Sequence, residues 1–591
     1  MNKFVVVGMV VSLLNLAVRA EEVPEEVIEG EGEIQEPVAP ARYTATWKGG
    51  SGSWTDAANW SGHPEGLIPT NSLVDVVIDD DPAVDSSVDF TSRTSTTYEL
   101  GSIRLDSGDS LKFTKNFNGS SGFAAIGLQN SGTVNVNAAA SGNAQSVTLR
   151  VNEAFTNMAG AVVNVNGSTA RNRTSSWLRL PGDFRNDGEI NVLQASSDRN
   201  NSNLNINNPG TAVNNGTILF RITGLYSSSS TYSRMVFDWS DANTGAAILG
   251  SGSIILDGDR EGSLAGGPSI SAGSNTMVLT NGVNHTIRGC GVMDKFGLVN
   301  EGLVFSSGTN RALSVQTVGV DTFNGKPIRN LASGRMVSSS PFGLYIGYNS
   351  SSASCFINEG LLEARSGSFI QTRTGVSHST TKWAAATHDV GGVLAGGGEF
   401  RFSRPVKLLD GARICPGDLA NTVNAAGETV YGTGVSTCGR LSFASNLTMS
   451  APQAGTEENP DGTSGAIAEF QCRKPEAGKY DSVWVNGDAT VAGTLRFLEQ
   501  PKAGTYPIFT STGTLTCDLA ALKIELADGV RAPKLKLNTA ATYMVEEPVL
   551  DKESGEPVLD EETGLPKTQM VEKPCQRLEA TWTGGFTVFV R

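Results

Sequence analysis

The stretch that decides the fold runs from Phe184 to Val192 and reads Phe-Arg-Asn-Asp-Gly-Glu-Ile-Asn-Val. It joins an apolar-x-Asn tripeptide and a glycine to a run in which apolar and polar residues alternate. Asn and Gly tolerate left-handed backbone conformations, so they suit a tight corner, and the alternation turns one face of the following strand inward. The tripeptide recurs at Leu128–Asn130, Phe155–Asn157, Ala212–Asn214, Leu298–Asn300, Ile328–Asn330 and Phe356–Asn358, each time with a glycine shortly after it.

The spacing of these tripeptides is nearly constant. Their asparagines lie 27, 29, 28, 86, 30 and 28 residues apart, and 86 is close to three steps of 29. A fixed step indicates stacked, similar units, and a unit of this size can form one coil of a parallel β-helix. We predict about ten coils between residues 111 and 410, at roughly 4.8 Å per coil. Equivalent asparagines should stack as a ladder at the corner, and this ladder is predicted to contain Asn130, Asn157, Asn186, Asn214, Asn243, Asn300, Asn330 and Asn358.

An array of β-sandwiches is the alternative architecture, because it also uses short strands and glycine turns. A sandwich, however, gives no reason for one corner tripeptide to return at a constant spacing. Gly and Asn are poor helix formers, and we find no run of a dozen residues with helical apolar spacing between positions 45 and 410. We therefore predict an all-β fold built on a right-handed parallel β-helix.

The first 42 residues indicate where the protein is found. Residues 1–20 contain Lys3, an apolar run and small residues before Glu21, which is the pattern of a secretory signal peptide. Residues 21–42 are dense in Glu and Pro and are predicted to be a disordered acidic linker. We expect a secreted, extracellular or surface-exposed protein that is not integrated in a membrane. The net charge of -15 opposes nucleic acid as a partner, because phosphate binding requires clustered Lys and Arg.

The folded part divides into three regions. Residues 43–110 interleave Trp47, Trp54 and Trp60 with glycine, and we predict a β cap that covers the open end of the β-helix. A platform of tryptophans that stacks sugars is the alternative role for these side chains. Residues 111–412 hold the repeats, and residues 413–591 are predicted to form a C-terminal β region. Within it, residues 545–574 repeat Glu-Pro-Val-Leu-Asp and form an exposed acidic insertion.

All seven cysteines follow residue 289. In an oxidising compartment the candidate disulfides are Cys415 with Cys438 and Cys517 with Cys575, and the odd total leaves at least one thiol over. No Cys-x-x-Cys motif occurs and the four histidines are scattered, so we predict neither a metal site nor a cofactor. Calcium binding by the carboxylates of the acidic insertion is the alternative, although the ligand spacing of a known calcium loop is absent.

Both ends of the folded part carry family-like motifs. The opening Ala45–Trp60 contains Trp-x-Gly-Gly-x-Gly-x-Trp followed by Asn-Trp. In the C-terminal part, Gly396–Phe400, Cys415–Gly417, Gly439–Phe443, Tyr480–Gly487 and Gly504–Phe509 follow in order. This set resembles secreted bacterial passenger proteins of the autotransporter-associated β-strand repeat and PEP-CTERM type. The resemblance implies a bacterial surface protein. The chain reaches Arg591 without a translocator barrel or a sorting tail, so we expect it to be released or held by a partner.

Parallel β-helices also include pectate lyases and polygalacturonases, which gather carboxylates on one face. The best local match is Asp183–Glu189, with three acids and an arginine, but corners require Asp, Asn and Gly in any case. We therefore predict no catalytic residues and a structural or adhesion-type β-helix. Its candidate partners are extracellular polysaccharide and other surface proteins. A β-helical polysaccharide lyase or glycoside hydrolase is the alternative function.

Overall fold

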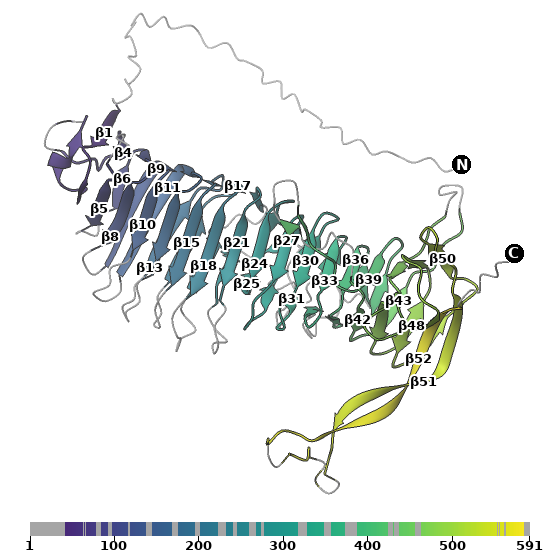
Figure 1. Cartoon of the computed structure of the whole chain (residues 1–591). Helices are drawn as coiled ribbons and strands as arrows, with labels where there is room; N and C mark the ends of the chain where they lie inside the picture. Colours follow the sequence, from purple (N-terminus) through teal and green to yellow (C-terminus); the bar gives the residue numbers. More distant parts are fainter. Residues whose placement is uncertain are drawn as a thin grey trace, which may run out of the picture. The chain divides into compact units, whose positions relative to one another are not determined.

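Each repeat forms one coil of three short strands joined by corners. In the coil that contains the fold-deciding stretch, these are β14 (Arg185–Asn186), β15 (Glu189–Gln194) and β16 (Asn201–Ile206). Along β15, Ile190 and Val192 are fully buried while their neighbours are partly exposed, as the alternation predicts. The computed structural model in Figure 1 shows the strands stacked in chain order, and the prediction of an all-β parallel β-helix is confirmed.

The structure describes residues 42–583 with gaps. The residues left out of this range are 63, 65–66, 79–83, 93–96, 116–118, 138–144, 168–174, 195–200, 223–231, 240–244, 259–266, 274–276, 317–327, 348–355, 373–386, 424–428, 431–436, 456–461, 552–553, 555 and 561–562. The predicted signal peptide and nearly all of the predicted linker therefore lie outside the described residues.

Three parallel sheets run along the stack, because each strand pairs with its counterpart one coil later. Sheet 1 contains the strands that precede the corner asparagines, and β14 there pairs with β17 (Gly210–Asn214) so that Asn186 lies beside Asn214. Its other strands are β1 (Tyr43–Trp47), β4 (Val74–Ile78), β7 (Ile103–Leu105), the ends of β9 (Gly119–Asn130) and β11 (Gln145–Asn157), β20 (Gly245–Leu249), β23 (Val278–Asn281), β26 (Gly297–Asn300), β29 (Ile328–Asn330), β32 (Phe356–Asn358), β35 (His388–Val390), β38 (Val406–Leu408), β43 (Leu447–Met449), β46 (Ala489–Val491) and β49 (Leu515–Cys517).

Sheet 2 follows the asparagine corner and contains β15. Its other strands are β2 (Ser51–Ser53), β5 (Ser87–Ser92), β8 (Ser110–Lys115), β10 (Thr133–Asn137), β12 (Val162–Asn166), β18 (Thr217–Ile222), β21 (Ser253–Asp257), β24 (Thr286–Gly289), β27 (Leu303–Ser306), β30 (Arg335–Ser338), β33 (Leu361–Ala364), β36 (Val393–Gly396), β39 (Arg413–Pro416), β44 (Ile467–Phe470), β47 (Thr494–Phe497) and β50 (Lys523–Leu526).

Sheet 3 contains β16 and completes each coil. Its other strands are β6 (Thr97–Leu100), the beginnings of β9 and β11, β13 (Ser175–Leu180), β19 (Tyr232–Phe237), β22 (Ser269–Ala272), β25 (Gly291–Asp294), β28 (Leu313–Val315), β31 (Leu344–Ile346), β34 (Phe369–Thr372), β37 (Glu399–Phe402), β42 (Arg440–Phe443), β45 (Ser482–Val485) and β48 (Gly504–Ser511). Inward side chains from all three sheets form one apolar core from Ala45 to Trp582. Each fully buried aliphatic side chain in it contributes about 1.5–3 kcal/mol to stability.

The parallel sheets extend on both sides of residues 111–412. Sheet 2 begins with β2, inside the tryptophan-rich segment, and continues to β50, which pairs in register with β47. The first coils therefore lie within the predicted cap, and the last coils lie within the predicted C-terminal region. The tripeptide is absent from the sheet 1 corner of these coils, so the repeat pattern alone did not include them.

An antiparallel hairpin ends sheet 3. The strand β52 (Thr568–Trp582) pairs with β48 in the antiparallel sense, and β51 (Lys534–Pro548) pairs with β52. The hairpin carries the predicted acidic insertion between its strands, where Leu550, Leu559 and Leu565 are exposed. The remaining described elements are small: η1 (Ala57–Asn59), β3 (Trp60–Ser61), β40 (Thr422–Val423) and β41 (Thr429–Val430). No helix in the described part of the chain has the length and hydropathy that crossing a membrane requires.

Candidate functional site

The corner asparagines of sheet 1 stack with their side chains buried. Asn130, Asn157, Asn186 and Asn214 are each fully buried, and the Nδ2 of each of the first three donates to the Oδ1 of the next asparagine at 2.7–2.8 Å. The same ladder continues at 2.8 Å from Asn300 through Asn330 to Asn358. A buried amide without partners would cost about 1–3 kcal/mol, so the ladder makes the corner stable by satisfying each amide with its neighbour.

The ladder is interrupted for one coil. Strand β20 pairs with β17 so that Leu249 lies beside Val213, and the position next to Asn214 is therefore Gly250. Gly250 has φ +103°, and an added Cβ would clash with the carbonyl oxygen of Asn214. The predicted ladder member Asn243 lies outside the described residues. Glycine at position 250 leaves space over Asn214 that a side chain from another coil can occupy.

His285 fills this space. Its Nε2 lies 3.0 Å from Asn214 Nδ2, and its Nδ1 lies 2.7 Å from the Oδ1 of Asn281, a ladder residue that the sequence analysis missed. Asn281 Nδ2 in turn donates to Asn300 Oδ1 at 2.8 Å. Because an amide nitrogen only donates and an amide oxygen only accepts, His285 must be neutral with its proton on Nδ1. The signal for Asn281 was present in the sequence, since Gly282 follows it directly.

Burial of His285 predicts a pH dependence of stability. Burial lowers the pKa of His285 from 6.5 to about 4. Between these two pH values the imidazole is protonated in the unfolded chain and neutral in the folded protein. The stabilising contribution is complete above pH 6.5 and is lost as the pH falls toward 4, at about 1.4 kcal/mol per unit. We expect wild type to lose about 2 kcal/mol more than His285→Gln between pH 7.5 and pH 5, measured by urea unfolding. Parallel pH profiles for the two proteins would contradict this assignment.

The three predicted cap tryptophans form one buried cluster. Trp54 is 0% exposed and stacks on Phe90 with ring centroids 4.7 Å apart, while Trp47 and Trp60 are each 3% exposed. The ring centroid of Trp60 lies 5.0 Å from that of Trp47 and 4.8 Å from that of Trp54. Rings that are buried in this way present no face to a ligand. The alternative of a sugar-stacking platform at these residues is therefore wrong.

Neither candidate disulfide is formed, because Cys415, Cys438, Cys517 and Cys575 are free thiols. Cys415 lies on β39, and its thiol donates to Glu469 Oε2 on the neighbouring strand β44 at 3.2 Å. The Sγ of Cys438 instead approaches the carbonyl oxygen of Gln471, at 3.7 Å. Cys517 and Cys575 are also unpaired. The pairings failed because order along the chain does not show which strands become neighbours.

The acidic corner Asp183–Glu189 ties coils together. Asp183 Oδ1 accepts from the backbone N–H of Thr211 in the next coil at 2.8 Å. Asp187 accepts from Arg185 at 2.6 Å and from Asn215 at 2.7 Å. Partial burial acts to raise the pKa of Asp187, but these hydrogen bonds lower it overall. An aspartate held in the charged form is a poor general acid. The contacts of Asp183 and Asp187 instead stabilise the corner of the coil.

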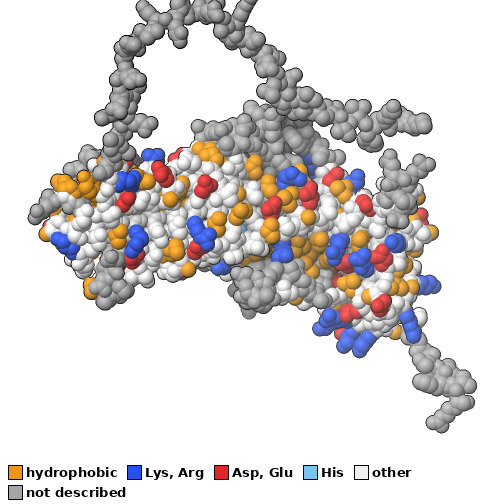
Figure 2. Space-filling view, turned by 90° about the horizontal axis from the view of Figure 1, so that it is seen from above, with side chains coloured by type: hydrophobic (Ala, Val, Ile, Leu, Met, Phe, Trp, Pro, Cys, Tyr) orange, Lys and Arg blue, Asp and Glu red, His pale blue; other side chains and the backbone are white. Residues whose placement is uncertain are grey.

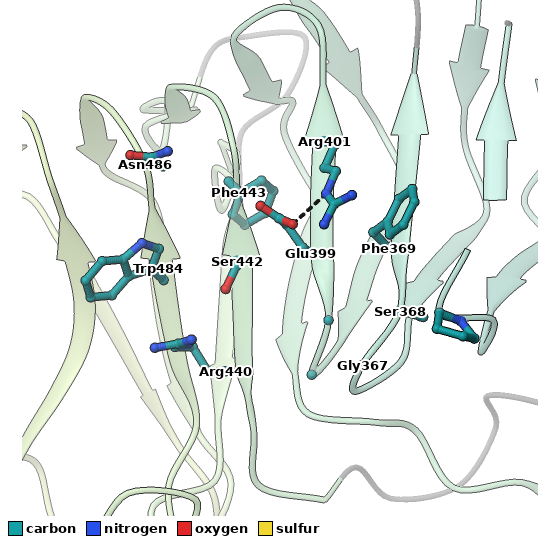
Figure 3. Close-up of a pocket in the computed structure, with 13 residues that line it drawn as sticks. Gly367, Ser368, Phe369, Glu399, Arg401, Arg440, Ser442, Phe443, Trp484 and Asn486 are labelled. Carbon is teal, nitrogen blue, oxygen red and sulfur yellow. Dashed lines mark hydrogen bonds and ion pairs between the residues drawn. The ribbon is translucent and has the colours of Figure 1, made fainter. Parts of the chain in front are cut away.

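A groove on the outer face of sheet 3 has a volume of about 640 Å³. Strands β34, β37, β42 and β45 place Phe369, Glu399, Ser442 and Trp484 in one row, because the parallel register makes each the neighbour of the next. Figure 3 shows Ser442 between Trp484 and Glu399. Because the Ser442 side chain is small, the groove is deepest there. Trp484 and Phe369 lie at the two ends of the row. Three strand steps separate these aromatic residues, which corresponds to about 14 Å.

Two arginines of the groove lie over the aromatic rings. The guanidinium carbon of Arg401 lies 3.8 Å from the ring centroid of Phe369, and that of Arg440 lies 5.4 Å from Trp484. Arg401 also forms an ion pair with Glu399 at 2.6 Å. At one end the groove is bordered by the hairpin, since the Tyr543 ring packs edge-on against Trp484 at 4.9 Å. On the face shown in Figure 2, charged side chains are scattered singly over the coils and gather toward the C-terminal end.

Sequence reasoning missed this groove. The alternation in Arg-Leu-Ser-Phe at 440–443 and Ser-Val-Trp-Val at 482–485 could have shown that Arg440, Ser442 and Trp484 face outward. It could not show that Ser442 pairs with Trp484, which lies 42 residues later in the chain. In the described residues, no three or more His, Cys, Asp or Glu side chains gather as metal ligands.

The fold and the groove define a parallel β-helix with a hollow of ligand size on one outer face. No protein-family model matches this sequence, and no curated protein is similar enough to be counted as a relative. The resemblance to autotransporter-associated and PEP-CTERM-type passenger proteins stays a prediction.

Proposed function

We propose that this protein is a secreted or surface-exposed β-helix of the adhesion type, which binds extracellular carbohydrate in the sheet 3 groove without catalysing a reaction. The observation that carries the proposal is the row from Trp484 through Ser442 to Glu399, in which one partly exposed aromatic ring and polar side chains line one hollow. Apolar sugar faces stack on aromatic rings, and sugar hydroxyls exchange hydrogen bonds with groups such as Ser442 and Asn486.

The β-helix suits this role because it holds the groove rigidly. The lining side chains stand on strands whose backbones pair on both sides, so little conformational freedom is lost when a ligand binds. The inner faces of the same strands are anchored by Phe400, Phe443 and Val485, all fully buried. A secreted protein that presents a preformed groove on a long stack can attach a surface to a polymer.

A polysaccharide lyase or hydrolase is the second candidate, because one carboxylate and two arginines share the groove. Glycoside hydrolases that follow the usual mechanism use two carboxylates that flank the scissile bond. Among the residues that the structure describes, Glu399 is the one carboxylate lining the groove, and it is paired with Arg401. We therefore expect no shortening of chains on a panel of polysaccharides, tested with and without calcium. Detectable cleavage that disappears in Glu399→Gln would establish the enzyme instead.

Binding is tested with Trp484→Ala. Loss of a central aromatic contact is expected to weaken carbohydrate binding at least about tenfold, measured by glycan array and titration calorimetry. Trp177→Ala is a matched control, because Trp177 stands on β13 of the same sheet with Arg179 over its ring at 5.6 Å, yet lies outside the groove. Equal losses in the two variants, or no loss in Trp484→Ala, would contradict the proposed site.

A further inference from the structure

The charges of the groove point to the kind of carbohydrate it takes. Glu399, Arg401 and Arg440 are its charged lining residues. The ion pair between Arg401 and Glu399 cancels two of these charges and leaves the guanidinium of Arg440. In the described part of the chain, no carboxylate forms an ion pair with Arg440. The groove therefore carries one uncompensated cation on a protein whose net charge is -15.

Arg440 is held where a bound sugar would meet it. It stands on β42 two residues before Ser442, on the same outward face, and its guanidinium lies over the Trp484 ring on the adjacent strand. Stacking on the ring orients the planar guanidinium and leaves its N–H groups free to donate. A guanidinium pairs with a carboxylate through two parallel hydrogen bonds, which a hydroxyl group cannot accept.

We propose that the groove binds an oligosaccharide that contains uronic acid, with a sugar ring against Trp484 and its carboxylate on Arg440. This inference rests on the proposed function and adds the ligand class. Phe369 is only 8% exposed and Arg401 covers its ring, so that end of the groove is polar. The row spans about 14 Å, which exceeds one sugar ring, so a ligand that follows it from Trp484 is an oligomer lying along the stack. The rest of this acidic protein repels a polyanion, which confines binding to the groove.

The experiment compares three ligands of equal length: oligogalacturonate, its methyl ester, and an oligosaccharide that carries sulfate groups but no carboxylate. Calorimetry with the full chain at low salt should show that the acid form binds at least about tenfold more tightly than the ester, because the ester cannot form the charge-assisted pair with Arg440. The affinity for the acid should fall as salt is added. Arg440→Gln should reduce the ratio of acid to ester affinity to near one, and Arg440→Lys should retain part of it.

The matched control is Arg179→Gln, which removes an arginine over a tryptophan on the same sheet but outside the groove, and it should leave the ratio unchanged. Thermal unfolding of each variant shows that the fold is retained. A ratio that Arg440→Gln does not change would overturn the uronate inference, while Trp484→Ala still reports on the groove as a carbohydrate site. Equal binding of the sulfated ligand would show an anion site without selectivity for carboxylate. Absence of binding to any ligand would overturn both the inference and the proposed function.

Discussion

Replacing His285 with alanine is expected to lower the free energy of unfolding by about 4 kcal/mol. The side chain is fully buried and forms the link between Asn214 and Asn281 across the coil that has Gly250 at the corner. Its removal leaves Asn214 Nδ2 and Asn281 Oδ1 without their partner in a site that the rest of the corner closes off from water. The cavity left in the close-packed interior adds to the free-energy cost of the two lost hydrogen bonds.

Urea unfolding followed by circular dichroism at pH 7.5 measures this loss. His388→Ala is the matched control, because His388 also has a pKa lowered to about 4 by burial, but its Nε2 hydrogen bonds to hydroxyl groups, with Thr372 Oγ1 at 3.1 Å and Ser403 Oγ at 3.4 Å, while its ring packs against Phe402. Ser403 is exposed and its hydroxyl group can turn to water, so we expect His388→Ala to lower the free energy of unfolding by only about 1 kcal/mol. A loss of less than 1 kcal/mol in His285→Ala would show that the two halves of the ladder do not depend on the histidine.

The second large effect is expected at Trp54. Trp54→Ala should cost about 4 kcal/mol, since truncation of a buried tryptophan typically costs 3–5 kcal/mol. The side chain is fully buried, its Nε1–H donates to the carbonyl oxygen of Pro69 at 3.0 Å, and its ring supports both Phe90 and Trp60. Without it, the aromatic cluster of the first coils loses its central ring, and the predicted cap should be weakened. The damage should be local, because each coil of a stacked fold contacts mainly its neighbours.

Hydrogen exchange of wild type and Trp54→Ala would show where stability is lost. We expect faster exchange in β1, β4 and β5 and unchanged exchange near β42 and β45 at the groove. Trp177→Ala again serves as control, because Trp177 is only partly buried on the outer face of sheet 3 and should cost less than 1 kcal/mol. If Trp54→Ala unfolds all coils together, the cap does not act as a separate cover.

The repeat was readable because its signals are local. An apolar-x-Asn tripeptide, a glycine and an alternating run occur within nine residues, so the position of the corner at Asn186 and the inward face of β15 could be predicted from sequence. The left-handed backbone expected at this corner is not adopted, because neither Asn186 nor Gly188 has a positive φ. Glycine is needed at position 188 because a Cβ would lie 2.3 Å from the carbonyl oxygen of Ala161. The step of about 29 residues then required the corners to stack. The coils after residue 412 carry the same three strands but lack the tripeptide at the sheet 1 corner, and the repeat could not be followed there from sequence.

By itself, therefore, the sequence determined that the chain winds as a parallel β-helix with asparagines at one corner, because those properties depend on residues close to one another in the chain. Tertiary structure alone decided that His285 bridges the coil of Gly250 and that Arg440, Ser442 and Trp484 share a groove. Both arrangements join residues separated by about one or two coils, and the loops between them differ in length. The register that brings such residues together is set by the packing of whole coils on the core.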